Sequence, residues 1–356
     1  MSGGPVEMPA PGGLAWIVRP NPASPVLGAL ARLSGEACHY AEPYLRAVAG
    51  ETGRLVAFML CCGAEVRAFG AAVEEGGPPR RRLTFPTLPH ILDPEPAVAD
   101  TFWGGIRRHC RARRVAHLLL QSFEGTPLPV PPLGLEVWRR DRTEFVVDLT
   151  APPEALLKAF ASNHRRNIRK AETAGLSFRV VATLEACREH AALVAHSMGR
   201  RRERGERVPG PDGAEAYHRL VAAGAGQIMR LEGADGQALS SFLMLITPRC
   251  AYYDSGGTGE QGMGLGASHG LMWRAIQHLR ERGVAQLNLG GITAEDSEGL
   301  RRYKAGFGAR EVRLAHREFV TVGPVRRGLW QAAEACLRAP GRLMAAVRGG
   351  PGNGAH

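Results

Sequence analysis

The sequence predicts an α+β protein of two domains, and two observations support this. The chain has 356 residues, which is more than one ordinary compact domain holds. Strand-like and helix-like segments alternate from about residue 30 to 149, and a similar order of elements recurs afterwards. We therefore expect a domain boundary near residue 150, although the two halves share no visible sequence repeat.

The first half is expected to begin with a flexible arm, because residues 1–28 are rich in Pro, Gly and Ala. A domain follows at 29–149. Its expected elements are a hairpin, a helix with apolar residues at helical spacing, and two further strands: 55–62 with 65–72, 98–113, 115–121 and 143–149.

The second domain is expected at 150–322. Its first helix starts with proline in the first turn and has Glu154 near the positive end of the helix dipole. The further elements are a three-strand meander, a long helix, a strand, a short helix and a last strand: 227–232, 239–247, 251–255, 266–282, 284–289, 297–304 and 310–320. Residues 323–356 are expected to form a basic helix and tail.

Composition excludes several classes of protein. Apolar residues make up 44% and charged residues 22% of the chain, as in a globular protein. No apolar run is long enough for a transmembrane helix, and the N-terminus lacks the pattern of a secretory signal. The seven cysteines are scattered, so neither a disulfide framework nor a zinc site is expected. A reducing cytoplasm fits best.

The chain is strongly basic, with a net charge of +11 and a pI near 9.8. This charge favours a polyanionic partner, such as RNA, a phosphorylated co-substrate or an anionic lipid surface. The alternative is a basic protein without such a partner. Only three of the 45 basic residues are lysine, so a lysine retained in a motif suggests that a compact ammonium is required there.

A glycine-rich turn lies between a predicted strand and a predicted long helix. Backbone N–H groups at such a helix start can bind an anion, and glycine permits close approach. The turn reads Q-G-M-G-L-G, which resembles the pyrophosphate loop of GNAT acetyltransferases. The donor-binding candidates are Gln261, Gly262, Gly264, Gly266 and Ala267. The alternative is a flexible linker.

A second motif near the end of the chain reads Y-K-A-G-F-G. It resembles the aromatic-Lys-x-Gly-Phe-Gly stretch of the Fem family, whose members transfer amino acids from aminoacyl-tRNA to peptidoglycan precursors or related amines. The resemblance implies that Lys304 helps to hold the substrate and neutralises negative charge near the reacting ester. In GNAT enzymes a similar stretch, one residue longer, carries a tyrosine that can protonate the leaving group, so Tyr303 is a candidate for proton transfer. The alternative is a surface lysine on a helix.

A third motif reads R-R-N-I-R-K-A-E-T-A-G-L and resembles the segment that opens the second domain of Fem-like proteins. It predicts a helix that ends at Gly175, with Ile168 on the packing side. Arg165, Arg166 and Arg169 are phosphate-binding or acceptor-binding candidates, because guanidinium groups bind phosphate oxygens in pairs. A solvated basic helix is the alternative.

Further candidates lie on or near these elements. Tyr253 and Asp254 end the strand before the glycine turn, where a substrate amine would lie; Tyr253 could move a proton and Asp254 is the one acid proposed as base. Asn288 ends a later strand. Arg207 and Tyr217 are acceptor-site candidates on a basic segment whose alternative interpretation is again a solvated surface.

Together the motifs identify the chain as similar to FemAB-like N-acyltransferases of the GNAT superfamily, a group that includes BioF2-like acetyltransferases. The resemblance spans about residues 30–322. It implies two GNAT-like domains in tandem, each a mixed, mostly antiparallel sheet flanked by helices. It also implies amide formation between an activated acyl or aminoacyl donor and an amine, without a metal or a permanently bound cofactor.

The donor stays open at this stage. Aminoacyl-tRNA is the leading co-substrate, with a small amine or a cell-wall precursor as acceptor, and acyl-CoA or an acyl carrier is the alternative. The inserted helical hairpin with which some relatives embrace tRNA is missing. The third alternative is a non-catalytic module that binds nucleic acid or a membrane. A peripheral contact with the inner membrane face is compatible with the basic tail, and no stable protein partner is implied.

Overall fold

A computed structural model describes residues 6–10, 13–206, 208, 210, 212–296 and 298–321. The helices are α1 (Ser24–Leu33), η2 (Cys38–Tyr40), α2 (Glu42–Ala49), α3 (Pro96–Arg113), α4 (Pro153–Ala159), α5 (Ser162–Thr173), α6 (Leu184–Glu203), α7 (Ala214–Ala222), α8 (Glu260–Gly264), α9 (Ala267–Glu281) and α10 (Glu298–Ala305). The strands are β1 (Val6–Ala10), β2 (Leu14–Pro20), β3 (Arg54–Cys62), β4 (Glu65–Glu75), β5 (Arg82–Phe85), β6 (His90–Ile91), β7 (His117–Leu120), β8 (Leu135–Asp148), β9 (Ser177–Val181), β10 (Gly226–Glu232), β11 (Ala238–Ile246), β12 (Cys250–Thr258), β13 (Gln286–Thr293) and β14 (Arg310–Val320).

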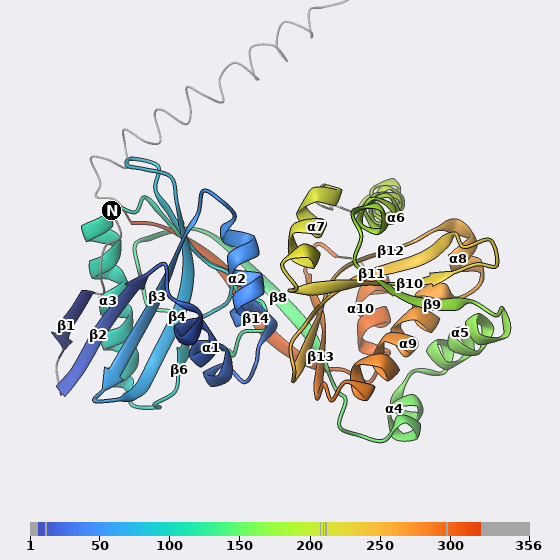
Figure 1. The fold of residues 1–356 in the computed structure, drawn as a ribbon, viewed down its shortest axis with the longest axis horizontal. Coiled ribbons are helices and arrows are strands. Elements are labelled where there is room, and N and C mark those ends of the chain that lie inside the picture. Colours follow the sequence, from blue (N-terminus) through green and yellow to red (C-terminus); the bar gives the residue numbers. More distant parts are fainter. Residues whose placement is uncertain are drawn as a thin grey trace, which may run out of the picture.

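In the described part of the chain the strands form one 14-stranded sheet in the order β1-β2-β3-β4-β5-β7-β14-β8-β13-β12-β11-β10-β9, with β6 beside β4. Most neighbours are antiparallel, and the pairs β5–β7 and β12–β13 are parallel. Figure 1 shows two lobes side by side, with β8 and β14 running between them. The predicted fold class, two mixed and mostly antiparallel units flanked by helices, is confirmed.

The two halves exchange strands. β8, which precedes residue 150, pairs with β13 of the second half, and Phe145 and Val147 lie in the second hydrophobic core. β14, near the end of the chain, pairs with β7 of the first half, and Phe319 lies in the first core. The two exchanged strands also pair with each other along their length. Each half therefore needs a strand from the other to complete its core.

Helices cover both faces of each half. In the first half α3 packs on one face over a core that contains Trp16, Phe58 and Phe102. In the second half α9 and α10 lie on one face of the sheet and α6 and α7 on the other (Figure 1). A further apolar cluster joins α1, α2 and Tyr252 of β12 across the two halves.

The predicted flexible arm at residues 1–28 is wrong, because residues 6–10 already form β1, which pairs with β2. Residues 14–20 form β2, which pairs with β3, and α1 begins at Ser24. Trp16 and Leu27 are fully buried. The proline and glycine content suggested disorder, but the buried side chains of Trp16 and Val18 hold this strand in the sheet.

Most other expected elements are present. The hairpin, the helix at 98–113, the meander and the last strand at 310–320 are all observed. The strand expected at 143–149 is much longer and begins at Leu135. The predicted C-terminal helix and tail at 323–356 lie outside the described residues. None of the described helices combines the length and apolar character needed to cross a membrane.

Candidate active site

The second half contains a wedge where two parallel strands separate. β12 pairs with β13 only from Cys250 to Tyr252. Beyond that point Tyr253 and Asp254 have no partner on β13, and a bulge also removes Asp254 from the pairing with β11. The wedge therefore holds peptide groups outside the ladder, and such groups can hydrogen-bond a carbonyl that enters between the strands.

Lys304 reaches this wedge from α10. On the β13 side, Leu289 and Gly290 form a bulge, and Gly290 has a φ of +71°. A Cβ atom at Gly290 would lie 3.0 Å from the carbonyl oxygen of Tyr253 and 3.3 Å from Nζ of Lys304. Lys304 donates a hydrogen bond to the carbonyl of Gly291 at 3.0 Å. Glycine at 290 thus leaves space for the ammonium beside the strand ends.

The ammonium of Lys304 is buried among other charges. Lys304 as a whole is 6% exposed. Burial, followed by the positive charge of Arg142, lowers its pKa to about 7, Arg201 acts in the same direction, and Glu144 and Asp296 act in the opposite one. A donor in such a dehydrated position interacts strongly with negative charge that develops next to it.

Two tyrosines flank Lys304. The ring centroid of Tyr253 lies 5.8 Å from Nζ, and Gly256 leaves room for its hydroxyl, because a Cβ there would overlap it. Tyr303 points towards α9 and donates its hydroxyl to the carbonyl of Ser268 at 3.2 Å. Burial raises the pKa of both phenols. Both therefore keep their proton at neutral pH and are hydrogen-bond donors.

Asp254 faces a different set of groups. Its side chain is exposed, yet dehydration by the surrounding protein raises its pKa to about 6, while the charge of His39 and a hydrogen bond from Ser255 act in the opposite direction. The exposure of the side chain and its raised pKa are compatible if the carboxyl group lies at the bottom of a recess that water can enter. A pKa near 6 suits a group that accepts protons at neutral pH.

Tyr217 of α7 reaches the same region. It is buried, and Ser255 and Asp254 are among the groups that act on its pKa. His190 of α6 bonds the hydroxyl of Ser255, at 3.0 Å, and its ring packs on Tyr217 at 4.7 Å between centroids. The structure therefore brings Tyr217 and Asp254 together, whereas Arg207 lies outside the described residues.

The glycine-rich segment before α9 is largely packed against the protein itself. Instead of an open loop it contains the short helix α8, on which Gln261 is exposed. A Cβ at Gly262 would overlap a carbonyl of β11, and one at Gly266, which has a φ of +70°, would lie 2.5 Å from the carbonyl oxygen of Asn167 in α5. Gly264, by contrast, faces open space.

The start of α9 has no side-chain cap at its N-cap residue, Gly266. Helix α9 begins at Ala267 after Gly266, and a helix N-terminus favours negative charge. Tyr303 bonds the carbonyl of Ser268 and precedes Lys304 in the chain. The start of α9 and Lys304 are therefore connected through Tyr303, on the side of the sheet that α9 and α10 cover.

Helix α5 crosses the start of α9. His164, Ile168 and Ala171 are its buried residues, as the third motif predicts for Ile168. Arg165 donates to the backbone carbonyls at 158 and 160 and so closes the preceding turn. The two other arginines of the motif are exposed and form no ion pair with described residues: Arg166 and Arg169.

A buried hydrogen-bond network lies beneath the wedge. Asn288 donates to the carboxylate of Glu144 at 2.7 Å and accepts from the N–H of Gly290 at 2.9 Å. Glu144, from the exchanged strand β8, also pairs with Arg142 at 2.9 Å and accepts from Tyr252 at 3.2 Å. The side-chain amide of Asn288 therefore already has partners within the protein, one for its NH₂ group and one for its oxygen. Glu144 and Arg142 were not predicted as site residues, because β8 carries many charged side chains and nothing in the sequence distinguishes these two.

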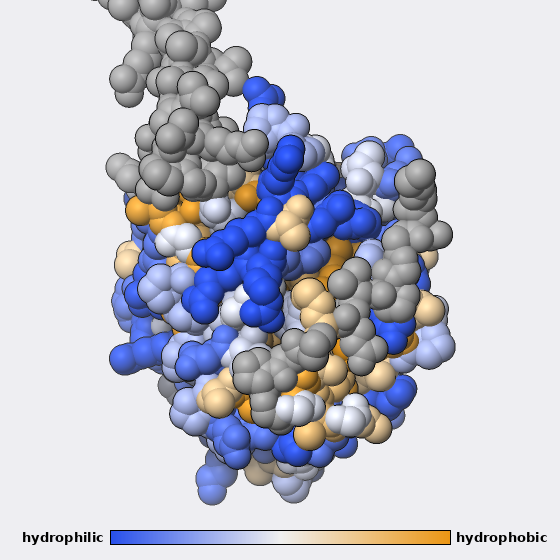
Figure 2. All heavy atoms as spheres, turned by 90° about the vertical axis from the view of Figure 1, so that its left-hand side faces the viewer, coloured by the Kyte–Doolittle hydropathy of each residue, from blue (hydrophilic) through white to orange (hydrophobic). Residues whose placement is uncertain are grey.

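If the partner is RNA, the arginine-rich segments of the sequence are its expected contact surface: 80–82, 107–114, 164–170 and 200–207. These segments do not form one surface. Residues 80–82 and 107–114 lie near each other in the first half, where Arg81 and Arg113 both approach Glu74. Figure 1 places α3 and α5 at opposite ends of the molecule. Figure 2 views the end that carries α3, where hydrophilic side chains gather across the upper part beside apolar areas. Any one ligand would contact only some of these segments.

Comparisons with known proteins agree with this geometry. Residues 158–305 match the family described as "Acetyltransferase (GNAT) domain", a range that contains α5, the wedge and Lys304. No curated protein sequence matches the chain. This part of the second half is therefore similar to GNAT acetyltransferase domains, as the motifs predict.

Solved structures resemble most of the chain. FemX has a TM-score of 0.60 at 10% identity, over 82% of this chain and 93% of FemX. A tandem GNAT protein from the clavulanic acid biosynthesis pathway scores 0.49 at 13% identity, over 77% and 85%. A GCN5-related N-acetyltransferase from Sphaerobacter thermophilus scores 0.43 at 14%, over 86% and 96%. At such low identity the match to FemX shows the fold alone.

Proposed function

We propose that this protein is an N-acyltransferase that moves an acyl or aminoacyl group from an activated ester or thioester to an amine. The observation that carries the proposal is the buried ammonium of Lys304 beside a wedge of unpaired strand backbone. Burying an ammonium opposes folding, so its presence suggests a use for the charge, and amide formation provides one.

The residues divide the chemistry as follows. The amine attacks the carbonyl carbon, and the carbonyl oxygen becomes an oxyanion. An ammonium has three donors, so Lys304 can bind the oxyanion while it keeps its bond to the carbonyl of Gly291. One such donor accounts for about 3 kcal/mol of transition-state stabilisation.

Proton transfer completes the reaction. Asp254, with a pKa of about 6, accepts the proton that the amine releases when its bond to the carbonyl carbon forms. The carbon–oxygen or carbon–sulfur bond to the carrier then breaks. The phenol of Tyr253, which keeps its proton at neutral pH, donates it to the departing oxygen or sulfur, and Tyr217 lies where the acceptor would enter.

The proposed donor is an aminoacyl-tRNA, and acyl-CoA is the second candidate. The Fem-like segment around Lys304 and the net charge of +11 favour RNA. The N-terminus of α9 at Ala267 favours a phosphate group of either carrier. The acceptor is a small amine or an amine-bearing cell-wall precursor, and either donor implies a cytoplasmic enzyme.

The test is to incubate the full chain with pools of radiolabelled aminoacyl-tRNA and acyl-CoA in the presence of mixed amine acceptors. We expect label to leave one pool and to appear in an amide. A Lys304→Met variant should leave the label in place, whereas Lys158→Met, which changes an exposed lysine on α4, should behave like the wild type.

Two results would contradict the proposal. If neither pool loses label to any amine, the chain is not a transferase for these donors. If the protein binds RNA equally well with and without Lys304 and transfers nothing, the binding-module alternative is correct.

A further inference from the structure

The carboxyl group of Asp254 lies close to helices from both halves of the molecule. Its charge raises the pKa of Tyr44 in α2 and that of Tyr217 in α7, in addition to the larger effect of burial. The helices α2 and α7 contact each other, and Figure 1 shows them facing each other where the two lobes meet. Asp254 is itself exposed, so a ligand that enters the recess between these helices reaches its carboxylate.

Aromatic side chains form the walls of the recess at Asp254. Tyr44 packs edge-on against the ring of His39, and His39 packs edge-on against Tyr252 of β12, each at 4.7 Å between ring centroids. Tyr217 approaches from the second half and is buried. The faces of aromatic rings attract cations, as a carboxylate does. The recess therefore combines two kinds of group that bind an ammonium.

A second carboxylate adds negative charge to the recess. Asp212 precedes α7 by two residues, and its charge acts on Tyr217 and on Asp254. Both aspartates are exposed, and neither forms an ion pair with a described residue. His39, whose charge lowers the pKa of Asp254, is itself paired with Glu124 at 2.6 Å. The recess is thus locally negative in a chain whose net charge is +11, which favours a cationic ligand.

Tyr44 offers a hydroxyl group that the protein does not use. The residue is 8% exposed, and its hydroxyl forms no hydrogen bond with a described residue. Of the charges that raise its pKa, that of Asp254 has the largest effect, which indicates that the phenol faces this carboxylate. A phenol oxygen can accept a hydrogen bond from an ammonium, which has three donors. The first half therefore contributes a binding group to the recess.

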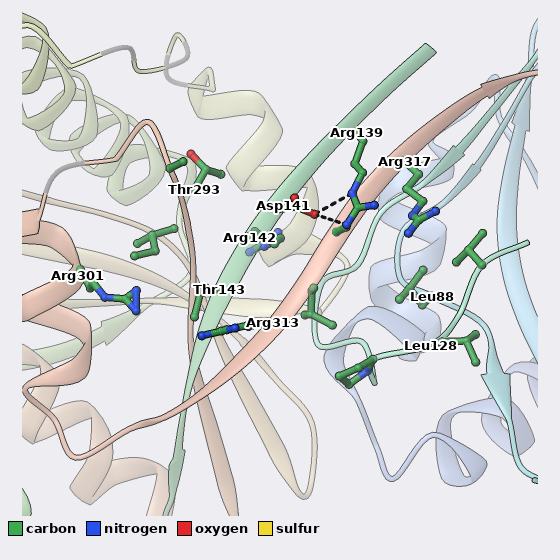
Figure 3. Close-up of a pocket in the computed structure, with 16 residues that line it drawn as sticks. Leu88, Leu128, Arg139, Asp141, Arg142, Thr143, Thr293, Arg301, Arg313 and Arg317 are labelled. Carbon is green, nitrogen blue, oxygen red and sulfur yellow. Dashed lines mark hydrogen bonds and ion pairs between the residues drawn. The ribbon is translucent and has the colours of Figure 1, made fainter. Parts of the chain in front are cut away.

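Another opening between the two halves has the opposite charge. It is a cavity of about 580 Å³, and its described lining residues include five arginines and one acidic residue, Asp141. Figure 3 shows these arginines on β8, β14 and α10. The residues that surround Asp254 do not line this cavity. A cationic ligand is therefore repelled there and attracted to the recess at Asp254.

We propose that the recess at Asp254 binds the acceptor and that this acceptor is an aliphatic diamine. One amino group lies at Asp254, and the second lies at Asp212 as an ammonium. The carbon chain between them packs against Tyr44 and Tyr217. The same negative charge disfavours amines that carry a carboxylate or a phosphate in place of the second amino group. The choice of the amine at Asp254 as the reacting group rests on the proposed function, whereas binding of the diamine requires no donor.

The test measures binding of three ligands to the full chain by calorimetry, without a donor: cadaverine, pentylamine and ε-aminocaproate. All three have an amino group on a linear carbon chain, and the far end carries an ammonium, no charge or a carboxylate. We expect cadaverine to bind most tightly. We expect ε-aminocaproate to bind at least about tenfold more weakly, because Asp212 repels its carboxylate.

Asp212→Asn tests the second carboxylate. The variant should bind cadaverine at least about tenfold more weakly but pentylamine within about twofold of the wild type, since only the diamine uses Asp212. The matched control is Asp100→Asn, which changes an exposed aspartate of α3 that forms no ion pair with a described residue. This control should bind all three ligands as the wild type does.

Tyr44→Phe tests the contribution of the first half. It removes the phenol oxygen but keeps the ring, and it should weaken cadaverine and pentylamine alike by about threefold to tenfold. Thermal unfolding of each variant is measured alongside binding. Unchanged binding of both amines by a folded Tyr44→Phe variant would remove the first half from the site.

Two results would overturn the inference. Equal affinity of the wild type for cadaverine and ε-aminocaproate would show that the recess does not select a second positive charge. Equal weakening of cadaverine binding in Asp212→Asn and Asp100→Asn would show attraction by net charge alone. Selective binding of cadaverine without any transfer would contradict the proposed function and support this inference, whereas transfer to amines without selective binding of cadaverine would do the reverse.

Discussion

Burial brings the pKa values of Lys304 and Asp254 close together. Burial disfavours the charged form of each, so it lowers the pKa of Lys304 to about 7 and raises that of Asp254 to about 6. Between these values a proton-accepting carboxylate and a proton-bearing ammonium coexist. That combination suits amide formation near neutral pH.

Asp254→Asn tests the carboxylate as base. Because the ionised form accepts the proton of the amine, kcat/KM of the wild type should fall as the pH drops through about 6. The variant should lose this acidic limb and at least about a hundredfold in kcat. The measurement is a pH profile of kcat/KM from pH 5 to 8. An acidic limb that persists in the variant would assign it to another group.

The same substitution makes a prediction for stability. The pKa of Asp254 in the folded state, about 6, lies above its ordinary value of 3.8, so the folded state binds more protons between these values and stability falls as the pH rises through them. Asp254→Asn should therefore raise the free energy of unfolding at pH 7 but hardly change it at pH 4. Urea titrations at the two pH values measure this, and a loss at pH 7 would contradict it.

Residue-scale features were predictable where they lie in a contiguous motif. Tyr303 and Lys304 stand in one short stretch, so their pattern was readable from the sequence. Glu144 and Arg142 are about 160 residues away in the chain and meet the wedge only through β8. Nothing local marks them, because their role comes from long-range strand pairing.

At the scale of elements, the glycine-rich segment before α9 has two functions that the sequence does not separate. Gly262 and Gly266 allow close contact with β11 and α5, whereas Gly264 has no protein atom within 4 Å of a Cβ. Glycine composition alone therefore overstated the open part of the turn. A short helix was missed there because glycine has low helix propensity.

Gly264→Val should weaken binding of the donor without unfolding the protein, because its new side chain points into open space. Gly262→Val is the matched comparison and should reduce stability by overlap with a backbone carbonyl. Donor affinity and thermal unfolding are measured for both. Unchanged donor affinity in the Gly264 variant would remove this segment from the donor site.

At the scale of the whole molecule, the strand exchange makes the halves interdependent. The order of elements predicted two units with a boundary near residue 150. However, Phe145 and Val147 complete the second core and Phe319 the first. Hydrophobic periodicity shows that a strand exists but does not identify its partner, so the exchange could not be predicted.

This exchange predicts one cooperative unfolding transition. Single-tryptophan variants that retain Trp103 in the first half or Trp273 in the second should report the same midpoint in urea, since neither core is complete alone. Midpoints that differ between the two probes would show that the halves unfold independently.

The most direct test of the central claim, that the wedge uses the charge of Lys304, is Lys304→Met measured for both transfer and stability. The pKa of Lys304 in the folded state, about 7, lies below its ordinary value of 10.5. The free energy of unfolding therefore rises as the pH increases from about 7 to 10.5. Below pH 7 the ammonium is charged in the folded state, and its burial opposes folding. At pH 7 the variant should lose at least about a hundredfold in rate and keep or increase its free energy of unfolding. Parallel loss of rate and stability, or a rate close to that of the wild type, would contradict the account.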